Sequence, residues 1–219
     1  MIDLTSYLDF TYLNDSAAHL DEFLDDAAKH KVASVCVYPK WIAKAKQHCD
    51  HPITTVINFP SGEVLQNKLQ EELVLAADAD EIDVVFPYQQ YLAEPDPSPV
   101  FEHFIKILQQ LPASKIVKVI VESGAYRNPQ DLHHICQFLI ELPIQFIKTS
   151  TGKIDVGATI EAATVILENV KGRSIGLKVS GGIRQYQQAL AYFELAQQYL
   201  PQISAKNFRI GASKLIGLP

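Results

Sequence analysis

Short runs of apolar residues alternate along the chain with longer segments in which apolar positions recur every three or four residues. Runs rich in Val, Ile and Phe are typical of buried strands, and the three-to-four spacing is typical of helices with one apolar face. The expected strands cover residues 7–11, 33–39, 53–60, 81–88, 114–123, 145–150, 175–181 and 207–213. The helix-like segments between them are LDEFLDDAAKH, WIAKAKQHC, LQNKLQEELVLAADA, VFEHFIKILQQL, NPQDLHHICQFLIEL, ATIEAATVILENV and QYQQALAYFELAQQYL.

Eight expected strands and seven intervening helices predict an α/β fold, the (β/α)8 or TIM barrel. Strands that are apolar on both faces favour a parallel sheet that is covered by helices. A closed barrel of 219 residues is compact beside the usual ~250, and a doubly wound open sheet is the alternative. No Gly-x-Gly-x-x-Gly motif, P-loop or long linker interrupts the pattern, so we expect a single domain over residues 1–219.

Composition and charge narrow the class of protein. The chain is 47% hydrophobic and 20% charged with a net charge of −6, which is typical of globular proteins and disfavours a general nucleic-acid surface. The three cysteines form no Cys-x-x-Cys pair, which argues against a disulfide framework. No apolar run is long enough to span a bilayer, and the first residues lack the features of a signal peptide. We therefore expect a cytoplasmic protein that binds neither nucleic acid nor membrane.

Four consecutive expected strands each hold an ionisable residue inside an apolar run, namely Asp83, Lys118, Lys148 and Lys178. An isolated buried charge is costly unless it is paired, and one aspartate cannot pair with three lysines. Each position alone could be a strand end near water or part of a structural ion pair. Together, in parallel strands, they favour an anionic ligand at the end of the sheet where α/β folds build active sites.

The two lysines Lys148 and Lys178 suggest nucleophilic catalysis. Like charge and desolvation both lower the pKa of a lysine, and a neutral amine can attack a carbonyl group to form a Schiff base. The resulting iminium withdraws electrons, so a carbon–carbon bond can break or form at the adjacent carbon. Asp83 is the expected group for proton transfer, either directly or through a bound water.

Two glycine-containing strand ends indicate a site for an anion. Gly181 and Gly182 follow the seventh expected strand, and Gly211 and Ser213 follow the eighth. Unhindered backbone N–H groups at such turns can bind a ligand oxygen, and barrels often bind phosphate in the loops after these two strands. Together with Lys153 in TSTGK, the two strand ends predict a phosphate site.

Eight short motifs, in order along nearly the whole chain, resemble those of the deoxyribose-phosphate aldolases. The motifs are LDFTYLND, ASVCVYP, TTVINFPSG, ADEIDVVFPY, VKVIVESG, FIKTSTGK, KVSGGIR and RIGASKL. The resemblance implies a barrel-shaped class I aldolase without metal or cofactor. It also implies interconversion of 2-deoxy-D-ribose 5-phosphate with D-glyceraldehyde 3-phosphate and acetaldehyde, in deoxyribonucleoside catabolism. The implied partners are phosphosugar and aldehyde substrates, and a homodimer is a candidate assembly.

The resemblance also implies roles for individual residues. Lys148 matches the Schiff-base lysine, Lys178 matches the lysine that perturbs it, and Asp83 matches the acid/base aspartate. The positions that match phosphate-loop residues are Lys153, Gly181, Gly182 and Ser213. Those that match residues near the sugar hydroxyls, or residues that support the site, are Thr151, Asp9 and Thr11. Lys214 replaces a small hydroxyl residue of many members, and it would either add charge to the phosphate site or point to solvent. The short segment after Ser213 is not expected to reach back over the site.

Other residues and functions stay open at this point. Cys36 could line the pocket, although a buried structural cysteine is the ordinary role of such a residue. The histidines lack the clustered arrangement of a catalytic metal site, which disfavours a metal-dependent aldolase. The alternatives are a phosphosugar isomerase or epimerase, a non-catalytic phosphosugar-binding protein, and a Schiff-base aldolase with a different donor. The two-carbon donor rests on the resemblance alone.

Overall fold

The chain forms a closed barrel of parallel strands. In the computed structural model, which describes residues 2–63 and 66–215, each strand pairs with the next one along the chain and the last pairs with the first. The strands are β1 (Leu8–Tyr12), β2 (Ser34–Val37), β3 (Ile53–Ile57), β4 (Glu81–Val85), β5 (Ile116–Ile120), β6 (Phe146–Lys148), β7 (Gly176–Ser180) and β8 (Phe208–Ala212). This closure confirms the predicted (β/α)8 fold and excludes the open doubly wound sheet.

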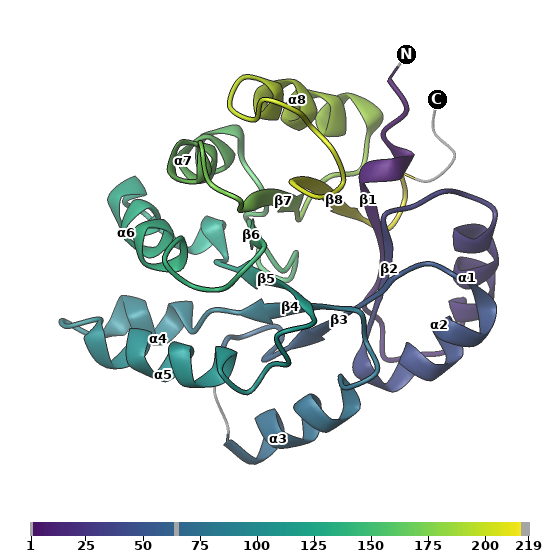
Figure 1. The fold of residues 1–219 in the computed structure, drawn as a ribbon, viewed down its shortest axis with the longest axis horizontal. Helices are drawn as coiled ribbons and strands as arrows, with labels where there is room; N and C mark the ends of the chain where they lie inside the picture. The colour runs from purple at the N-terminus through teal and green to yellow at the C-terminus, as the bar shows by residue number, and fades with distance from the viewer. Residues whose placement is uncertain (1, 64–65, 216–219) are drawn as a thin grey trace.

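Helices surround the strands and form the outer layer of the molecule (Figure 1). They are α1 (Leu20–Ala28), α2 (Ile42–His48), α3 (Gln66–Leu75), α4 (Tyr88–Ala93), α5 (Ser98–Leu108), α6 (Pro129–Leu139), α7 (Ile160–Val170) and α8 (Tyr186–Gln197). Three short 3₁₀ helices are η1 (Thr5–Tyr7), η2 (Pro39–Trp41) and η3 (Ser123–Ala125). Within the described ranges, no helix has both the length and the apolar character needed to cross a membrane.

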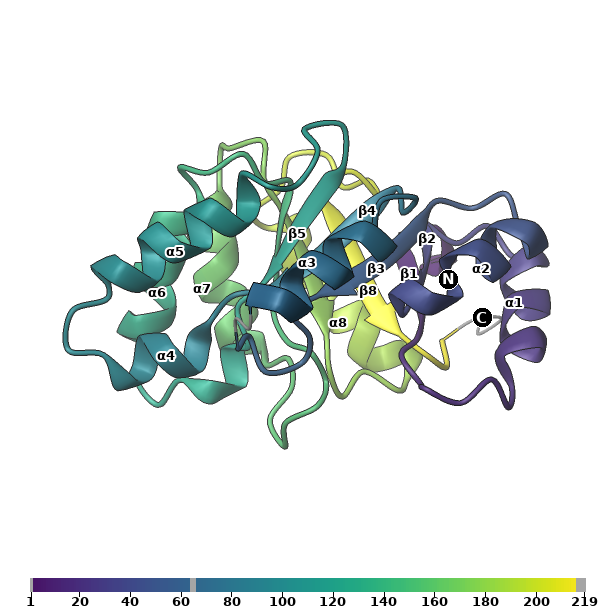
Figure 2. The ribbon, with the colours of Figure 1, turned by 90° about the horizontal axis from the view of Figure 1, so that it is seen from below.

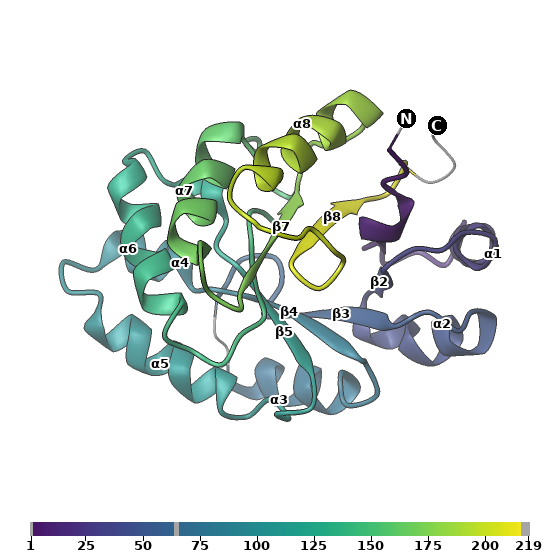
Figure 3. The same cartoon turned by 45° about the horizontal axis from the view of Figure 1, so that its top comes forward.

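The layer between the strands and the surrounding helices is apolar, and the interior of the barrel is polar. Buried apolar side chains of strands and helices form one continuous core, to which Leu24, Phe104 and Leu167 contribute from the helices. The helices α6, α7 and α8 lie side by side in Figures 1 and 3. Figure 2 shows strands crossing the middle of the molecule with helices on either side. Burial of this apolar surface supplies the main driving force for folding, which leaves the barrel interior free for charged side chains.

Local sequence determines where the helices that flank the site begin. Asn128 accepts a hydrogen bond from the backbone N–H of Gln130 (3.1 Å) at the start of α6. Thr159 accepts one from the N–H of Ala162 (3.1 Å) at the start of α7. Such caps satisfy N–H groups that have no partner within the first turn, and Pro129 occupies a position where the missing N–H costs little. Both helices therefore begin close to the carboxyl ends of the strands that precede them.

The observed strand ends differ from the predicted ends by up to three residues, and two of these differences have a local cause. The pattern predicts a strand over residues 81–88, but β4 ends at Val85 and the chain turns at Pro87 into the short helix α4. Proline has no N–H group to donate to a neighbouring strand, which makes it a poor continuation of a strand. The fifth strand is likewise shorter than predicted, because it ends at Ile120. Glu122 lies beyond this end in a left-handed conformation, which a strand does not contain.

Candidate active site

The strand register places ionisable side chains opposite one another inside the barrel. Asp83 is in register with Lys118 across β4 and β5, and Lys148 is in register with Lys178 across β6 and β7. Lys178 is also in register with Arg209 of β8. Because side chains alternate between the two faces of a strand, these inward-facing positions meet in the barrel interior. All five side chains are buried.

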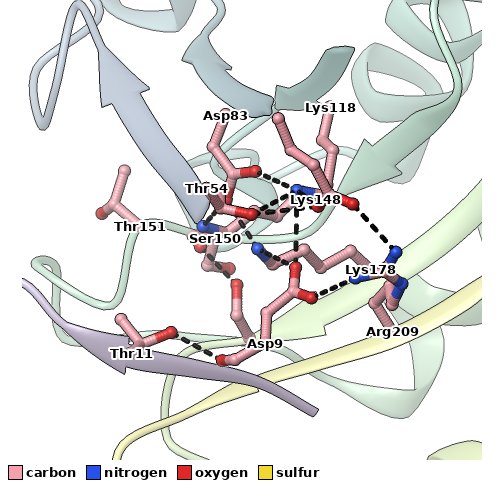
Figure 4. A network of polar contacts seen from close by, with 12 residues as sticks. Asp9, Thr11, Thr54, Asp83, Lys118, Lys148, Ser150, Thr151, Lys178 and Arg209 are labelled. Carbon is pink, nitrogen blue, oxygen red and sulfur yellow. Dashed lines mark hydrogen bonds and ion pairs between the residues drawn. The ribbon is translucent and has the colours of Figure 1, made fainter. Parts of the chain in front are cut away.

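Ion pairs join these residues into one buried cluster (Figure 4). Lys148 Nζ and Lys178 Nζ each lie 2.7 Å from Asp83 Oδ2, and Lys118 Nζ lies 3.0 Å from Asp83 Oδ1. Lys178 Nζ is also 2.5 Å from Asp9 Oδ2. The four ionisable residues that the sequence singles out in consecutive strands are therefore in direct contact with one another through Asp83.

The sequence analysis missed two members of the cluster, Glu81 and Arg209. Arg209 connects two acids, with Nη1 2.5 Å from Asp9 Oδ1 and Nη2 3.0 Å from Glu81 Oε1. Glu81 Oε2 lies 2.6 Å from Lys118 Nζ. The signal that could have found both residues is the one used for Asp83, an ionisable residue next to or inside a buried strand.

Two hydroxyl groups extend the cluster to the remaining strands. Thr54 Oγ1 on β3 accepts a hydrogen bond from Lys118 Nζ at 3.1 Å and donates to Glu81 Oε2 at 2.9 Å. The same hydroxyl lies 2.8 Å from Ser34 Oγ on β2. With these contacts, every strand of the barrel contributes a side chain to the polar interior.

The charges of the cluster balance only when one lysine is neutral. Fully ionised, the cluster has four cations and three carboxylates, which leaves one excess positive charge. A buried charge that has no partner of opposite sign is costly. Loss of a single proton from one lysine removes the excess charge and makes the cluster neutral. The cations are Lys118, Lys148, Lys178 and Arg209, and the carboxylates are Asp9, Glu81 and Asp83.

Lys148 is the cation that gives up its proton most readily. Burial lowers the pKa of Lys148, Asp83 opposes this effect, and the charge of Lys178 adds to it, so that the pKa lies below the ordinary value. Burial also acts to lower the pKa of Lys178, but Asp83 and Asp9 together outweigh it, and that pKa is raised. The difference follows from the ion pairs, because Lys148 contacts one carboxylate and Lys178 contacts two.

The acids of the cluster are held in the ionised form. Burial acts to raise the pKa of Asp83, but Lys118, Lys148 and Lys178 outweigh it and hold the pKa well below the usual range. The pKa of Asp9 is also held well below its usual range, because the nearby cations overcome the effect of burial. Asp83 is therefore a weak base that holds three lysine amines in place.

Lys148 borders a cavity at the carboxyl ends of the strands. The cavity has a volume of about 210 Å³ and is bounded by strand ends and loops of β1, β6, β7 and β8. Five of the predicted substrate-binding or phosphate-binding residues line it. These five are Thr11, Thr151, Gly181, Gly182 and Ser213.

The structure places the other predicted residues away from the cavity wall. Asp9 has no exposed surface and contacts Lys178 and Arg209, which favours a supporting role over direct contact with a sugar hydroxyl. Lys153 is exposed, and its Nζ donates at 3.3 Å to the backbone oxygen of Leu13, a residue that lines the cavity. Lys214 is also exposed.

The turn after β7 forms part of the cavity wall with backbone atoms. Gly181 and Gly182 have φ values of 90° and 82°, which glycine adopts without strain. A Cβ atom on Gly181 would lie 3.0 Å from the Cα atom of Gly157, so this turn packs closely against the loop after β6. Arg184 lines the cavity beside this turn and was missed by the sequence analysis, although KVSGGIR contains its positive charge.

Comparisons with known proteins agree with this geometry. The family model described as DeoC/LacD family aldolase matches residues 5–198. The chain belongs to this aldolase family. A solved structure described as QR15, an aldolase, is 31% identical, with a TM-score of 0.84 over 99% of this chain and 94% of that chain. The deoxyribose phosphate aldolase of Aeropyrum pernix, described as having a unique tetrameric structure, is 23% identical, with a TM-score of 0.78 over 96% of this chain and 86% of that chain.

Membership of the DeoC/LacD family confirms the predicted resemblance. The protein is an aldolase and therefore a lyase, and its family indicates small-molecule substrates. In residues 2–63 and 66–215 of this aldolase, no group of three or more His, Cys, Asp or Glu side chains is arranged to hold a metal ion. Cys36 is fully buried, and burial raises the pKa of its thiol, which is typical of an unreactive structural cysteine.

Proposed function

We propose that this aldolase reversibly cleaves 2-deoxy-D-ribose 5-phosphate to D-glyceraldehyde 3-phosphate and acetaldehyde through a Schiff base on Lys148. The observation that carries the proposal is the environment of the Lys148 amine. It is 3% exposed, has a lowered pKa and borders the cavity. A buried amine with a lowered pKa at the wall of a cavity suits covalent catalysis on a carbonyl group.

The first proposed step forms the Schiff base. Neutral Lys148 Nζ adds to the C1 aldehyde of the open-chain sugar, and the carbinolamine loses water to give a protonated iminium. Lys178 stays protonated because Asp9 and Asp83 raise its pKa, and its charge favours the neutral form of Lys148. Asp83 Oδ2 lies within hydrogen-bonding distance of both amines, which suits proton transfer between them during loss of water.

The second proposed step breaks the bond between C2 and C3. The C3 hydroxyl loses its proton, C3 becomes the aldehyde carbon of glyceraldehyde 3-phosphate, and the electron pair of the broken bond forms an enamine with the iminium. Protonation of the enamine at C2 and hydrolysis then release acetaldehyde and regenerate the Lys148 amine. The water lost in the first step is regained in the last, so the net reaction is a simple cleavage.

The phosphate is proposed to bind at the end of the cavity formed by the loops after β7 and β8. Gly181, Gly182 and Ser213 supply backbone and hydroxyl donors there, and Arg184 supplies a guanidinium group. Glycine turns of this kind bind anions, and a guanidinium group matches the geometry of a phosphate. The exposed ammonium of Lys153 adds positive charge at the rim. Deoxyribonucleoside catabolism, the cytoplasm and the homodimer stay predictions that rest on the resemblance and on the sequence.

The test is reduction with borohydride during incubation with acetaldehyde, followed by peptide mapping. We expect an ethyl adduct on Lys148 that is absent from Lys148→Arg, which keeps a long basic side chain but cannot form the iminium. An adduct on Lys148 with acetaldehyde, together with cleavage of deoxyribose 5-phosphate, would support the whole proposal. A folded protein that binds the sugar phosphate without forming the adduct would instead point to an isomerase, an epimerase or a binding protein.

A further inference from the structure

Glu122 is a buried carboxylate next to the candidate site that has no part in the Schiff-base steps. It follows β5 and has no exposed surface. Its backbone has φ 55° and ψ 58°, a left-handed conformation that is rare for residues other than glycine, asparagine and aspartate. Such conformations persist where the surrounding structure holds them, often at functional sites. The contacts of the Glu122 side chain show what holds it here.

The contacts of Glu122 are concentrated on Thr151. The Thr151 backbone N–H donates to the two carboxylate oxygens at 3.2 and 3.3 Å. The Thr151 hydroxyl also donates to Glu122 Oε2 in a short hydrogen bond. Because a hydroxyl group has one proton, the proton of Thr151 is committed to the carboxylate.

One acceptor position of the Thr151 hydroxyl remains for a ligand. A hydroxyl oxygen has two acceptor positions, and the backbone N–H of Lys153 takes one of them at 3.1 Å. Thr151 lines the same cavity as Lys148. It is therefore set up to accept a hydrogen bond from a substrate hydroxyl group and to pass a proton on to Glu122.

Glu122 is better suited than Asp83 to take up a proton. Burial raises the pKa of Glu122, and the hydrogen bonds from Thr151 and the charge of Lys148 only partly offset this effect. Lys148 on β6 and Tyr126 after η3 are the titratable groups that interact with it, and the pKa of Tyr126 is itself raised well above its ordinary value by burial. Asp83, in contrast, is held by three lysines as a weak base.

We infer that Glu122 is a positioning residue for carbon–carbon bond cleavage, acting through the Thr151 hydroxyl on the substrate hydroxyl that becomes the aldehyde. This inference rests on the proposed function. As the C3–O–H bond breaks, its proton moves to Thr151 Oγ1, and the proton of Thr151 moves to the Glu122 carboxylate. The C2–C3 electron pair passes to the iminium and forms the enamine. In the synthetic direction both protons return along the same path.

The experiment compares two reactions of Glu122→Gln. Glutamine keeps an oxygen that accepts the Thr151 hydroxyl but cannot take up its proton. The first reaction is cleavage of deoxyribose 5-phosphate. The second is exchange of the methyl protons of acetaldehyde for deuterium, which requires the Schiff base and the enamine but no reacting hydroxyl. We expect kcat for cleavage to fall about 100-fold with little change in KM, while exchange proceeds at the wild-type rate.

The pH dependence separates this role from a structural one. In the wild-type protein the ratio of cleavage to exchange should rise with pH as Glu122 ionises, whereas in Glu122→Gln it should not change with pH. Thr151→Val should reproduce the selective loss of cleavage, and Thr151→Ser should restore it. Equal losses of cleavage and exchange, or unchanged cleavage, would overturn the inference. If the wild-type protein formed no borohydride adduct on Lys148, the proposed function itself would fail, whatever the behaviour of the Glu122 variants.

Discussion

Lys148 and Lys178 hydrogen-bond to the same carboxylate oxygen, Asp83 Oδ2, each at 2.7 Å. Two ammonium groups at one oxygen repel each other, and the repulsion favours loss of one proton. Asp9 contacts Lys178 as well, at 2.5 Å, so Lys178 holds its proton more tightly than Lys148 does. The division of roles between the two lysines thus depends on a third side chain, from the first strand of the barrel.

Lys178→Leu should make Lys148 more basic. The substitution removes a positive charge beside Lys148 and leaves Asp83 with one fewer partner, and both changes favour the protonated amine. We expect kcat at neutral pH to fall by about 100-fold or more. The pH midpoint of borohydride trapping on Lys148 should move upward. Normal turnover with an unshifted midpoint would contradict this role for Lys178.

Ser213→Glu should selectively weaken the binding of phosphorylated substrates. Ser213 lines the cavity at the proposed phosphate end, and a carboxylate there would repel the phosphate. A charge-assisted hydrogen bond contributes roughly 1.5–3 kcal/mol, so KM for deoxyribose 5-phosphate should rise about 10-fold or more. The kinetics with unphosphorylated deoxyribose should change much less. Equal losses with both sugars would count against the phosphate assignment.

Lys214→Gln is the matched control for this substitution. It changes the net charge by the same amount as Ser213→Glu, one residue further along the chain, and Lys214 is exposed. We expect KM for the phosphorylated sugar to change by less than about twofold, since exposed charges interact weakly through water. A rise in KM as large as that of Ser213→Glu would show that the effect is one of overall charge and not of contact.

Asp9→Asn should destabilise the fold. The substitution leaves Lys178 and Arg209 with an uncompensated charge in the barrel interior, and breaking a buried ion pair in this way costs about 3–5 kcal/mol. The pKa of Asp9 is lowered in the folded protein from the ordinary 3.8, so its ionisation contributes stability that is fully present above that value. In urea unfolding, the difference in free energy of unfolding between the variant and the wild-type protein should be constant near neutral pH. It should shrink as the pH falls below about 4. A difference that grew with acidity would contradict the assignment.

Gly211→Ala should displace Lys178. A Cβ atom at this position would lie 2.9 Å from Ser180 Cβ and 3.3 Å from Lys178 Cε, so one of these side chains must move. Overpacking of this kind typically costs about 1–3 kcal/mol. We expect the pH midpoint of borohydride trapping on Lys148 to move upward, as in Lys178→Leu, but by less. A stable variant with an unchanged pH midpoint would show that only the Ser180 side chain moves and that Lys178 stays in place.

The sequence predicted the strands, the barrel and the four ionisable residues in consecutive strands, because strand periodicity and isolated charges are local signals. It could not supply the partners of those charges. Asp9 and Arg209 contact each other through the pairing of β1 with β8, across almost the whole length of the chain. No role was predicted for Glu122, because its contact with Thr151 depends on the loop after β6.

The buried cluster is divided between the two halves of the barrel by sign of charge. Its three carboxylates, Asp9, Glu81 and Asp83, come from β1 and β4, whereas its four cations come from β5, β6, β7 and β8. Either half alone would therefore hold only like charges in its interior, which repel one another and have no partner to offset desolvation. Closing the barrel joins an acidic half to a basic half, and the same event that completes the sheet also brings the charges of its centre into contact with their partners.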